Sequence, residues 1–493
     1  MQRVVSTRTD WAAIRKQIIG IDQQFEGPYG KKKIVYADWI ASGRLYGPIE
    51  EKMIRQFGPF TANTHTETNI TGSTMTQAYE EAKRIIKQHV HAGPDDVLIN
   101  TGSGMTGALA KLQRILGWKL PEQITGQVVL REEDRPVVFI THAEHHSNHT
   151  SWMETICEVV IIPPDPEGRT DLQAFAQLLQ QYSHRRTLVA SVTAGSNVTG
   201  YIPPYSEIAR MIHRVGGLCF VDFACSAPYV TIDMHPADED ARLDAIFFSP
   251  HKFLGGPGTC GVLIFNKSLY TNKVPDIPGG GTVKWTNPWG VHLFLDDIEH
   301  REDGGTPPFL QTIRTALCVR LKEQLGVENI QLREEELLHQ FFEGLGHVPG
   351  IRILAPDIRK RVGAFSLCIE GLHHNLGVKM LNDRYGIQVR GGCSCAGTYG
   401  HYLLGMDKDS SDRILQKILT GDPTEKPGWI RVSLHPLMTD EEAQYIIEAL
   451  LEVNEHHRRW RADYQFDVES NQFFHRQEER GESVSRWFDF EED

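Results

Sequence analysis

The chain has 493 residues, of which 40% are hydrophobic and 23% charged, and this exceeds what one compact core usually holds, so we expect a large domain with a smaller one. The net charge of -13 argues against general nucleic-acid binding, which needs a basic face, and no apolar run reaches the roughly 18 residues of a membrane-spanning helix. The first residues lack the apolar core of a secretory signal, so we expect a cytoplasmic protein, and eight cysteines in so long a chain do not indicate a disulfide framework.

The N-terminal part mixes helical and strand patterns. Asp10 can cap a first helix whose apolar residues fall on one face as far as Ile21. A short strand is expected at 33–38, and a helix at 74–90 leads to a strand at 97–100.

A glycine-rich turn, 101–107, follows that strand and opens a helix at 108–116. Such a turn offers unpaired backbone N–H groups and the positive end of a helix dipole to a phosphate. It also occurs as a plain loop, so the turn alone leaves both interpretations open.

The region 137–222 alternates strands with helices. The expected strands are 137–141, 158–162, 187–191 and 218–221, and the expected helices are 172–182 and 204–215. Repeated βα units predict a parallel sheet with right-handed crossovers and with ligands at the carboxyl ends of the strands.

Two apolar runs, 245–248 and 262–265, flank a turn that contains Lys252, with Ser249 and His251 just before it. A lysine held beside an apolar strand end loses hydration, which lowers its pKa and makes its amine usable for a Schiff base. The alternative is a surface lysine in a glycine-rich hairpin.

Asp222, at the end of the strand 218–221, supplies the context for Lys252. An aspartate there can pair with the protonated pyridine nitrogen of pyridoxal 5'-phosphate (PLP). Here the chain resembles the fold-type I PLP-dependent transferases, specifically the class V aminotransferase family and its cysteine desulfurase and selenocysteine lyase branch. The resemblance extends from about residue 36 to about residue 451.

The resemblance implies an α/β fold with a large, mostly parallel sheet domain and a smaller α+β C-terminal domain. We expect an N-terminal helical segment (1–35), a large PLP-binding domain (36–328), a small C-terminal domain (329–453) and a charged, aromatic-containing tail (454–493). Because disordered segments are poor in aromatic residues, part of the tail should pack on the body or on a dimer partner.

The same resemblance assigns the cofactor site. It implies that Ser103 and Gly104 bind the PLP phosphate, Asn197 the phenolic oxygen and Asp222 the pyridine nitrogen, and that Lys252 forms the Schiff base, with Ser249 and His251 beside it. His145, in the segment 144–148, would stack on the ring and relay protons, which suits a titratable imidazole. Zinc is the alternative for so many histidines, but the adjacent positions 145 and 146 point apart, so we expect no metal.

Two positions bear on how complete this site is. Cys225 stands where related desulfurases have a glutamine, and a thiol cannot replace the hydrogen bonds of an amide, so one cofactor contact is altered or supplied elsewhere. Thr306 lies in a Gly-Thr-Pro step like one that reaches the phosphate of the neighbouring subunit's PLP. That step predicts a homodimer with shared active sites, and the alternative is an ordinary surface loop.

The substrate side is expected to use two arginines. Arg431 matches the family's arginine that holds the α-carboxylate of the substrate through a bidentate fork. Arg390 matches a second position, just ahead of a cysteine-containing loop. Asp38 lies in a segment like one that borders the pocket, but for this residue we expect only a turn, and His65 stands where related enzymes place a pocket histidine.

The segment 389–396, Val-Arg-Gly-Gly-Cys-Ser-Cys-Ala, is similar to the desulfurase signature and places Cys395 as the nucleophile. A thiolate on a glycine-rich loop could attack the substrate's sulfur and carry a persulfide, whereas the alternative is a bystander cysteine. Cys393 would resolve or relay sulfur, or have no role. The longer segment 405–428 could cover the mouth of the site and restrict substrates.

The preferred function is therefore a cysteine desulfurase or selenocysteine lyase, which converts L-cysteine or selenocysteine to alanine and leaves a persulfide on Cys395 for a sulfur-acceptor protein. The first alternative is a class V aminotransferase or other PLP lyase that acts on a small amino acid without a catalytic cysteine. A scaffold that has kept the fold without activity is the second alternative.

Overall fold

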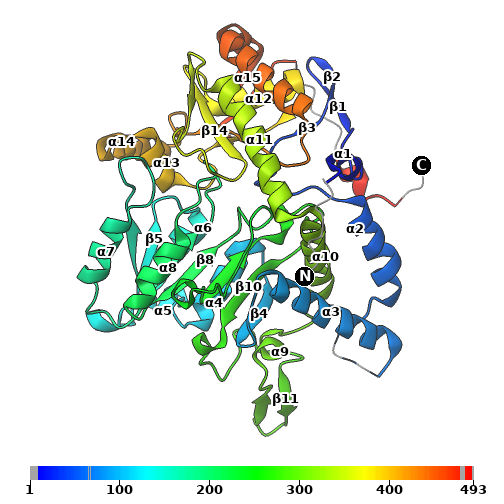
Figure 1. Cartoon of the computed structure of the whole chain (residues 1–493), viewed down its shortest axis with the longest axis vertical. Helices are drawn as coiled ribbons and strands as arrows, with labels where there is room; N and C mark the ends of the chain where they lie inside the picture. The colour runs from blue at the N-terminus through cyan, green and yellow to red at the C-terminus, as the bar shows by residue number, and fades with distance from the viewer. Residues whose placement is uncertain (1–8, 65, 67, 478–483, 491–493) are drawn as a thin grey trace.

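The computed structural model describes residues 9–64, 66, 68–477 and 484–490. Figure 1 shows two lobes: an α/β lobe built on one large sheet, and a lobe that holds most of the C-terminal third, with the helix α11 (Val327–Leu345) running from one to the other. The expected α/β architecture is confirmed.

A seven-stranded sheet forms the centre of the large lobe. Its strands, in spatial order, are β4 (Asp96–Thr101), β10 (Gly261–Asn266), β9 (Ala245–Phe248), β8 (Leu218–Asp222), β7 (Leu188–Thr193), β5 (Val137–Thr141) and β6 (Glu158–Ile162). Only β10 runs antiparallel to its neighbours within the sheet. Six of the seven strands are buried at all residues or at all but one, because helices cover both faces of the sheet. This burial explains their nearly continuous apolar sequences.

The helices form two layers around this sheet. Helices α4 (Gly104–Ile115) and α6 (His146–Met153) pack on one face, and the other face carries α3 (Ile70–His89), α7 (Leu172–Gln181), α8 (Tyr205–Arg214) and α10 (Phe309–Leu325). Alternate strand residues serve the two layers: Val97 and Ile99 contact the α4 side, and Leu98 the α3 side. Shorter elements of this lobe are α2 (Gly47–Lys52), α5 (Glu122–Thr125), α9 (Ile298–Glu302) and the hairpin of β11 (Val283–Thr286) and β12 (His292–Phe294).

The second lobe has a four-stranded antiparallel sheet in the order β13 (Ile351–Ile353), β14 (Ala364–Ile369), β17 (Trp429–Ser433) and β16 (Arg390–Gly392). Its helices are α11, α12 (His374–Tyr385), α13 (Gly397–Leu404), α14 (Lys408–Leu419) and α15 (Asp440–Trp460). The long segment 405–428 contains α14. A 2.8 Å hydrogen bond between His401 of α13 and Ser411 of α14 joins the two helices. Its effect on substrate choice stays a prediction.

The first helix is shorter than the apolar pattern predicted. Asp10 does cap it, accepting the N–H of Ala13, but α1 (Trp11–Arg15) ends before Ile18. The backbone at 17–19 instead pairs with 45–47, as the bridge between Ile18 and Tyr46 shows. These strand-like hydrogen bonds replace those that a longer helix would make.

The two ends of the described chain pack on the second lobe. The hairpin of β1 (Gln24–Gly27) and β2 (Gly30–Lys33) precedes β3 (Val35–Tyr36), which pairs in parallel with β15 (Ile387–Gln388). In the tail, β18 (Tyr464–Asp467) and β19 (Gln472–His475) form a second hairpin whose Tyr464 and Phe473 join the main core. This packing confirms the expectation for part of the tail. Among the described residues, no helix has the length and apolar character needed to cross a membrane.

Candidate active site

A cavity of about 200 Å³ lies at the carboxyl ends of the parallel strands, between the large sheet and the second lobe. It brings together nine of the residues expected from the sequence: Ser103, His145, Asn197, Asp222, Ser249, His251, Lys252, Arg390 and Arg431. Residues 103 to 252 follow the ends of β4, β5, β7, β8 and β9, whereas the two arginines come from β16 and β17. The site is thus assembled from segments that are distant in the sequence.

The glycine-rich turn enters the cavity at the start of α4. Gly102 and Gly104 have φ angles of +59° and +60°, which favour glycine. A Cβ on Gly104 would lie 2.8 Å from Ser249 Oγ and 2.9 Å from His251 Cε1, so this position has no room for a side chain. Ser103 makes no side-chain capping bond to its own helix, which leaves its hydroxyl available to a ligand at the helix N-terminus.

Lys252 and Asp222 provide an amine and a carboxylate in the same cavity. Burial lowers the pKa of Lys252, while the nearby Cys225 thiol and Asp222 oppose the shift. Burial raises the pKa of Asp222 to about 6, against the opposing effects of the Ala224 N–H, which it accepts at 2.7 Å, and of Lys252. The carboxylate is therefore mostly ionised at neutral pH.

His145 starts α6 as its N-cap and accepts the N–H of Ser147 on Nδ1 at 3.1 Å. Burial and the charge of Lys252 lower the pKa of His145 to about 3, so the ring is neutral near pH 7. Because Nδ1 is an acceptor, we assign the ring proton to Nε2.

Glu144 fixes this histidine turn, a role that the sequence pattern did not reveal. Its buried carboxylate accepts hydrogen bonds from the Thr141 hydroxyl at 2.6 Å, the Asn148 amide at 2.8 Å and the Thr193 N–H at 2.9 Å. Burial raises the pKa of Glu144 to about 7.

Arg431 is 1% exposed, and its guanidinium is oriented by two partners. Its Nη1 donates to the backbone oxygen of Asn197 at 3.0 Å, and its Nη2 donates to Asp38 Oδ1 at 2.5 Å. Arg390 Nε lies 3.7 Å from the other oxygen of Asp38. Within the described part of the chain, Arg431 Nε is buried without a hydrogen-bond partner, so one donor stays available.

The expectation for Asp38 was incomplete. Its backbone oxygen does accept turn hydrogen bonds from Ala41 and Ser42, as predicted. Its carboxylate, however, contacts both arginines of the cavity, which makes it a site residue. Those partners are more than 350 residues away in the chain, so local sequence could not reveal the contact.

We call residues 393–397 the cysteine loop. Ser394 and Cys395 have φ angles of +50° and +58°, in the left-handed region that non-glycine residues rarely adopt. The Asn197 amide donates to Ser394 O at 2.6 Å, while His146 N–H donates to Cys395 O at 2.8 Å. The loop is thereby joined by its backbone to two turns that carry cavity residues.

The two cysteines of the loop differ in exposure. Cys395 is exposed and does not line the cavity, whereas Cys393 is half-buried against an apolar cluster that includes Val198 and Tyr399. The catalytic role of Cys395 and any role of Cys393 stay predictions. Asn197 Oδ1 is buried and has no partner among the residues that the structure describes.

Three further positions that the sequence singled out, Cys225, Thr306 and His65, differ in where they lie. Cys225 is buried and lines the cavity. Thr306 lines a second, open cavity of about 710 Å³, together with Thr101 and Gly102 from the back of the glycine-rich turn. His65 lies outside the described residues. The described ranges contain no group of three or more histidine, cysteine or acidic residues arranged to hold a metal ion.

The donor set of the cavity fits PLP. The Ser103 hydroxyl, which makes no capping bond at the N-terminus of α4, suits a phosphate, Asp222 suits a pyridine nitrogen, and Lys252 supplies an amine. The unpaired Asn197 Oδ1 and Arg431 Nε mark places where polar groups of a ligand can be accommodated.

Solved structures of cysteine desulfurases share this fold. The apo structure of cysteine desulfurase from Thermococcus onnurineus NA1 superposes with a TM-score of 0.72 at 22% identity, covering 91% of this chain and 99% of that one. The cysteine desulfurase CsdA from Escherichia coli gives a TM-score of 0.69 at 21% identity with the same coverage.

Curated relatives are similar over most of the sequence. A probable cysteine desulfurase from Halalkalibacterium halodurans is 27% identical over 392 residues, which is 78% of this chain and 88% of the relative. A cysteine desulfurase from Haloferax volcanii is 26% identical over 400 residues, or 80% and 88% of the two chains. The family model "Aminotransferase class-V" matches residues 35–446. Since this match spans the large sheet, the cavity and most of the second lobe, the chain belongs to the class V aminotransferase family of PLP-dependent enzymes.

Proposed function

We propose that the chain is a PLP-dependent cysteine desulfurase that removes sulfur from L-cysteine, or selenium from selenocysteine, and releases alanine. The observation that carries this proposal is one cavity that holds Lys252, Asp222 and Arg431 and is joined to the cysteine loop through Asn197. The names of the curated relatives support the same activity.

The cofactor would be held by side chains already in place. Ser103 and the N–H groups at the start of α4, apart from that of Met105, which donates to Ser249 Oγ, would hold the phosphate. Asp222 would hold the ring nitrogen, and Lys252 the aldehyde carbon. When bound, PLP supplies a pyridinium ring that withdraws the electron pair released at the substrate's Cα.

The protein's own groups bind the substrate and move its protons. Arg431, aimed by Asp38, binds the α-carboxylate of the substrate, and Arg390 adds positive charge at the same end. Because burial lowers its pKa, Lys252 can take a proton from the substrate's Cα at Nζ. His145, neutral near pH 7, can donate a hydrogen bond from Nε2.

The sulfur step requires Cys395 to reach the cavity from its exposed position on the loop. Its thiolate attacks the sulfur of the substrate, so that an S–S bond forms and the Cβ–S bond breaks. The electron pair stays on Cβ, which takes up one proton to give alanine, while Cys395 keeps the sulfur as a persulfide. A sulfur-acceptor protein would then remove that sulfur at the surface.

Two further parts of the proposal concern assembly and location. The chain would act as a homodimer in which Thr306 reaches the phosphate site of the other copy. All eight cysteines lie in the described ranges and none forms a disulfide, which suits a reducing compartment such as the cytoplasm.

The second candidate is a class V aminotransferase or other PLP lyase in which Cys395 has no role. The exposure of Cys395 outside the cavity favours it, as does Cys225 in place of a glutamine. This enzyme would transfer the amino group of a small amino acid to a keto acid, or eliminate a side-chain group.

The test is release of alanine and sulfide from L-cysteine by the PLP-loaded protein, with Cys395→Ala and Cys393→Ala measured beside it. The desulfurase proposal expects turnover in the wild type and in Cys393→Ala, and loss of turnover in Cys395→Ala. Wild-type protein that shows the PLP absorbance but releases no sulfide would contradict it, and a screen of amino acids with keto-acid acceptors would then test the second candidate.

A further inference from the structure

A buried hydrogen bond joins α3 to the segment that carries Thr306. The Tyr79 hydroxyl donates to Asp303 Oδ2 at 2.8 Å, and the two residues are 3% and 9% exposed. Asp303 directly follows α9 and stands three residues before Thr306. We call the Tyr79–Asp303 pair the latch.

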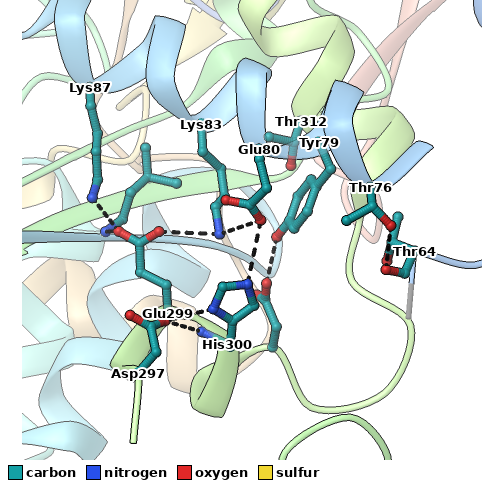
Figure 2. A network of polar contacts seen from close by, with 12 residues as sticks. Thr64, Thr76, Tyr79, Glu80, Lys83, Lys87, Asp297, Glu299, His300 and Thr312 are labelled. Atoms are coloured by element: carbon teal, nitrogen blue, oxygen red, sulfur yellow. Dashed lines mark hydrogen bonds and ion pairs between the residues drawn. The ribbon is translucent and has the colours of Figure 1, made fainter. Parts of the chain in front are cut away.

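Charged residues of α3 and α9 hold Tyr79 in place. Figure 2 shows Lys83 and Lys87 pointing from α3 toward Glu299 of α9. The Lys83 ammonium lies 4.9 Å from the centre of the Tyr79 ring and 3.1 Å from Glu299. Glu299 also accepts the N–H of Leu98 at 2.8 Å, so α9 is attached to β4 as well as to α3.

His300 extends this network, and a separate pair, Thr64 and Thr76, lies beside it. His300 lies between Asp297 at 2.8 Å and Glu80 at 3.7 Å, both shown in Figure 2. At the other end of the view, the Thr76 hydroxyl donates to Thr64 O at 2.6 Å. Through Lys83, Tyr79 is thus connected to the ion pairs between α3 and α9.

The segment from Asp303 to Pro308 has little freedom beyond the latch. A Cβ on Gly304 would lie 2.2 Å from Ile277 O, so the backbone there packs closely against another loop. Gly305 has a φ of +90° and donates its N–H to Gly280 O at 2.9 Å. Two prolines then lead into α10. Thr306, just before them, is exposed and accepts a 3.5 Å hydrogen bond from the Asn63 amide.

Burying the two polar groups of the latch has an energetic cost, which their hydrogen bond has to offset. Burial raises the pKa of Asp303, and a carboxylate buried here without a hydrogen-bond donor would destabilise the fold. A buried polar pair of this kind can fix a geometry as well as contribute stability. Here the geometry that it specifies is the start of the loop that presents Thr306.

Thr306 does not serve the cavity of its own chain. It lines the open cavity on the back of the glycine-rich turn, while Ser103 lines the cavity with Lys252 on the front. We propose that Tyr79 and Asp303 are positioning residues that hold Thr306 for the phosphate site of a second copy of this chain. This inference rests on the proposed PLP-dependent function. It implies that Tyr79 and Asp303 of one copy affect PLP binding in the active site of the other copy.

The first test is a double-mutant cycle on PLP affinity, measured by titrating apo-protein with PLP and following its absorbance. Tyr79→Phe removes only the hydroxyl and should weaken PLP binding about ten-fold, because Asp303 loses its donor and the loop shifts. Thr306→Ala should weaken binding by a similar factor. If Tyr79 acts through Thr306, adding Tyr79→Phe to Thr306→Ala changes the affinity little further.

Two controls separate positioning from general damage. Tyr182→Phe removes a hydroxyl that donates to Glu158 at the same 2.8 Å length, far from the cavity, and should leave PLP affinity unchanged. Asp303→Leu removes the oxygen that accepts the Tyr79 hydroxyl, and should reproduce the loss if Tyr79→Phe proves too unstable to purify. Fully additive effects of Tyr79→Phe and Thr306→Ala would overturn the inference.

The second test asks in which subunit the latch acts. Differently tagged chains carrying Lys252→Ala and Tyr79→Phe are co-expressed, and the mixed dimer is purified. The only pocket with Lys252 then belongs to the Tyr79→Phe chain but faces the intact latch of the other copy, so it should bind PLP as tightly as wild type. A site that stays about ten-fold weak, or a chain that is monomeric, contradicts action across the dimer.

These readouts are independent of desulfurase activity, because they measure PLP affinity. Wild-type protein that binds PLP but releases no sulfide overturns the proposed desulfurase reaction and leaves the cycle interpretable. Wild-type protein that binds no PLP overturns both the proposed function and this inference.

Discussion

The cavity wall and the cysteine loop differ in how firmly their key side chains are held. Around the cavity, Asp222, Glu144 and Arg431 are buried and each has defined hydrogen-bond partners. Cys395 is exposed and lies, with Ser394, in the left-handed region. Its loop is joined to the cavity turns through backbone hydrogen bonds, while Cys393 and Ala396 pack on an apolar cluster. The cofactor and substrate groups are thus preorganised, whereas the side chain of Cys395, the proposed sulfur carrier, is exposed.

Burying a charged group lowers the stability of the apo-protein, and the largest effect that we expect is that of the Asp222 carboxylate. A rise in the pKa of its carboxyl from 3.8 to about 6 corresponds to about 3 kcal/mol. Between these pH values the folded state binds more protons than the unfolded state, so this group lowers stability as the pH rises. The penalty is absent below 3.8 and fully present above about 6.

We therefore expect apo-protein with Asp222→Asn to be more stable than wild type at pH 7, by up to about 3 kcal/mol. The difference should shrink toward zero at pH 4, which serves as the internal control. Urea unfolding at both pH values measures it. An Asp222→Asn protein that is less stable at pH 7 would mean that the buried carboxylate stabilises the apo-fold.

The second prediction concerns how Asp38 aims Arg431. Asp38→Asn leaves the buried guanidinium without its charged partner, so KM for L-cysteine should rise about 30-fold with a smaller change in kcat. Asp22→Asn is the matched control, because it breaks the 2.6 Å pair with Lys33 at the exposed surface and should change neither constant. Equal losses of kcat in both variants would argue against a substrate-binding role for Asp38.

The third prediction tests the phosphate end of the cavity. Gly104→Ala places a methyl group against Ser249 and His251, so PLP affinity should fall about ten-fold or more. Gly117→Ala introduces the same left-handed strain, at a φ of +72°, with no atom within 4 Å. It should lower stability by about 1 kcal/mol and leave PLP binding intact. Similar PLP affinities for the two variants would contradict the assignment of the phosphate site.

Much of the fold could be predicted because its signals are local. The βα alternation from 137 to 222 follows from buried apolar runs, and each predicted strand lies within a residue or two of its observed counterpart, β5 to β8. The length of the first helix was predicted wrongly. The backbone at 17–19 forms hydrogen bonds with 45–47, and these contacts between distant residues replace the local hydrogen bonds of a longer helix.

The candidate site was predictable where its residues follow strand ends, and not where it depends on contacts between distant segments. Residues at strand ends, such as Asp222 and Lys252, were found because parallel strands bring their carboxyl ends together. The contacts of Asp38 with Arg431 and of Tyr79 with Asp303 join distant segments, and neither partner carries a local signal for the other. Such pairs become visible only when the layers are assembled.

The most direct test of the central claim is the mass of the Cys395 peptide after PLP-loaded protein has turned over L-cysteine without an acceptor or reductant. The proposed function predicts one additional sulfur on Cys395 in wild type and in Cys393→Ala, and none before substrate is added. An unmodified Cys395 in protein that has released alanine, or the extra sulfur on Cys393 alone, would contradict the claim that the exposed loop carries the sulfur on Cys395.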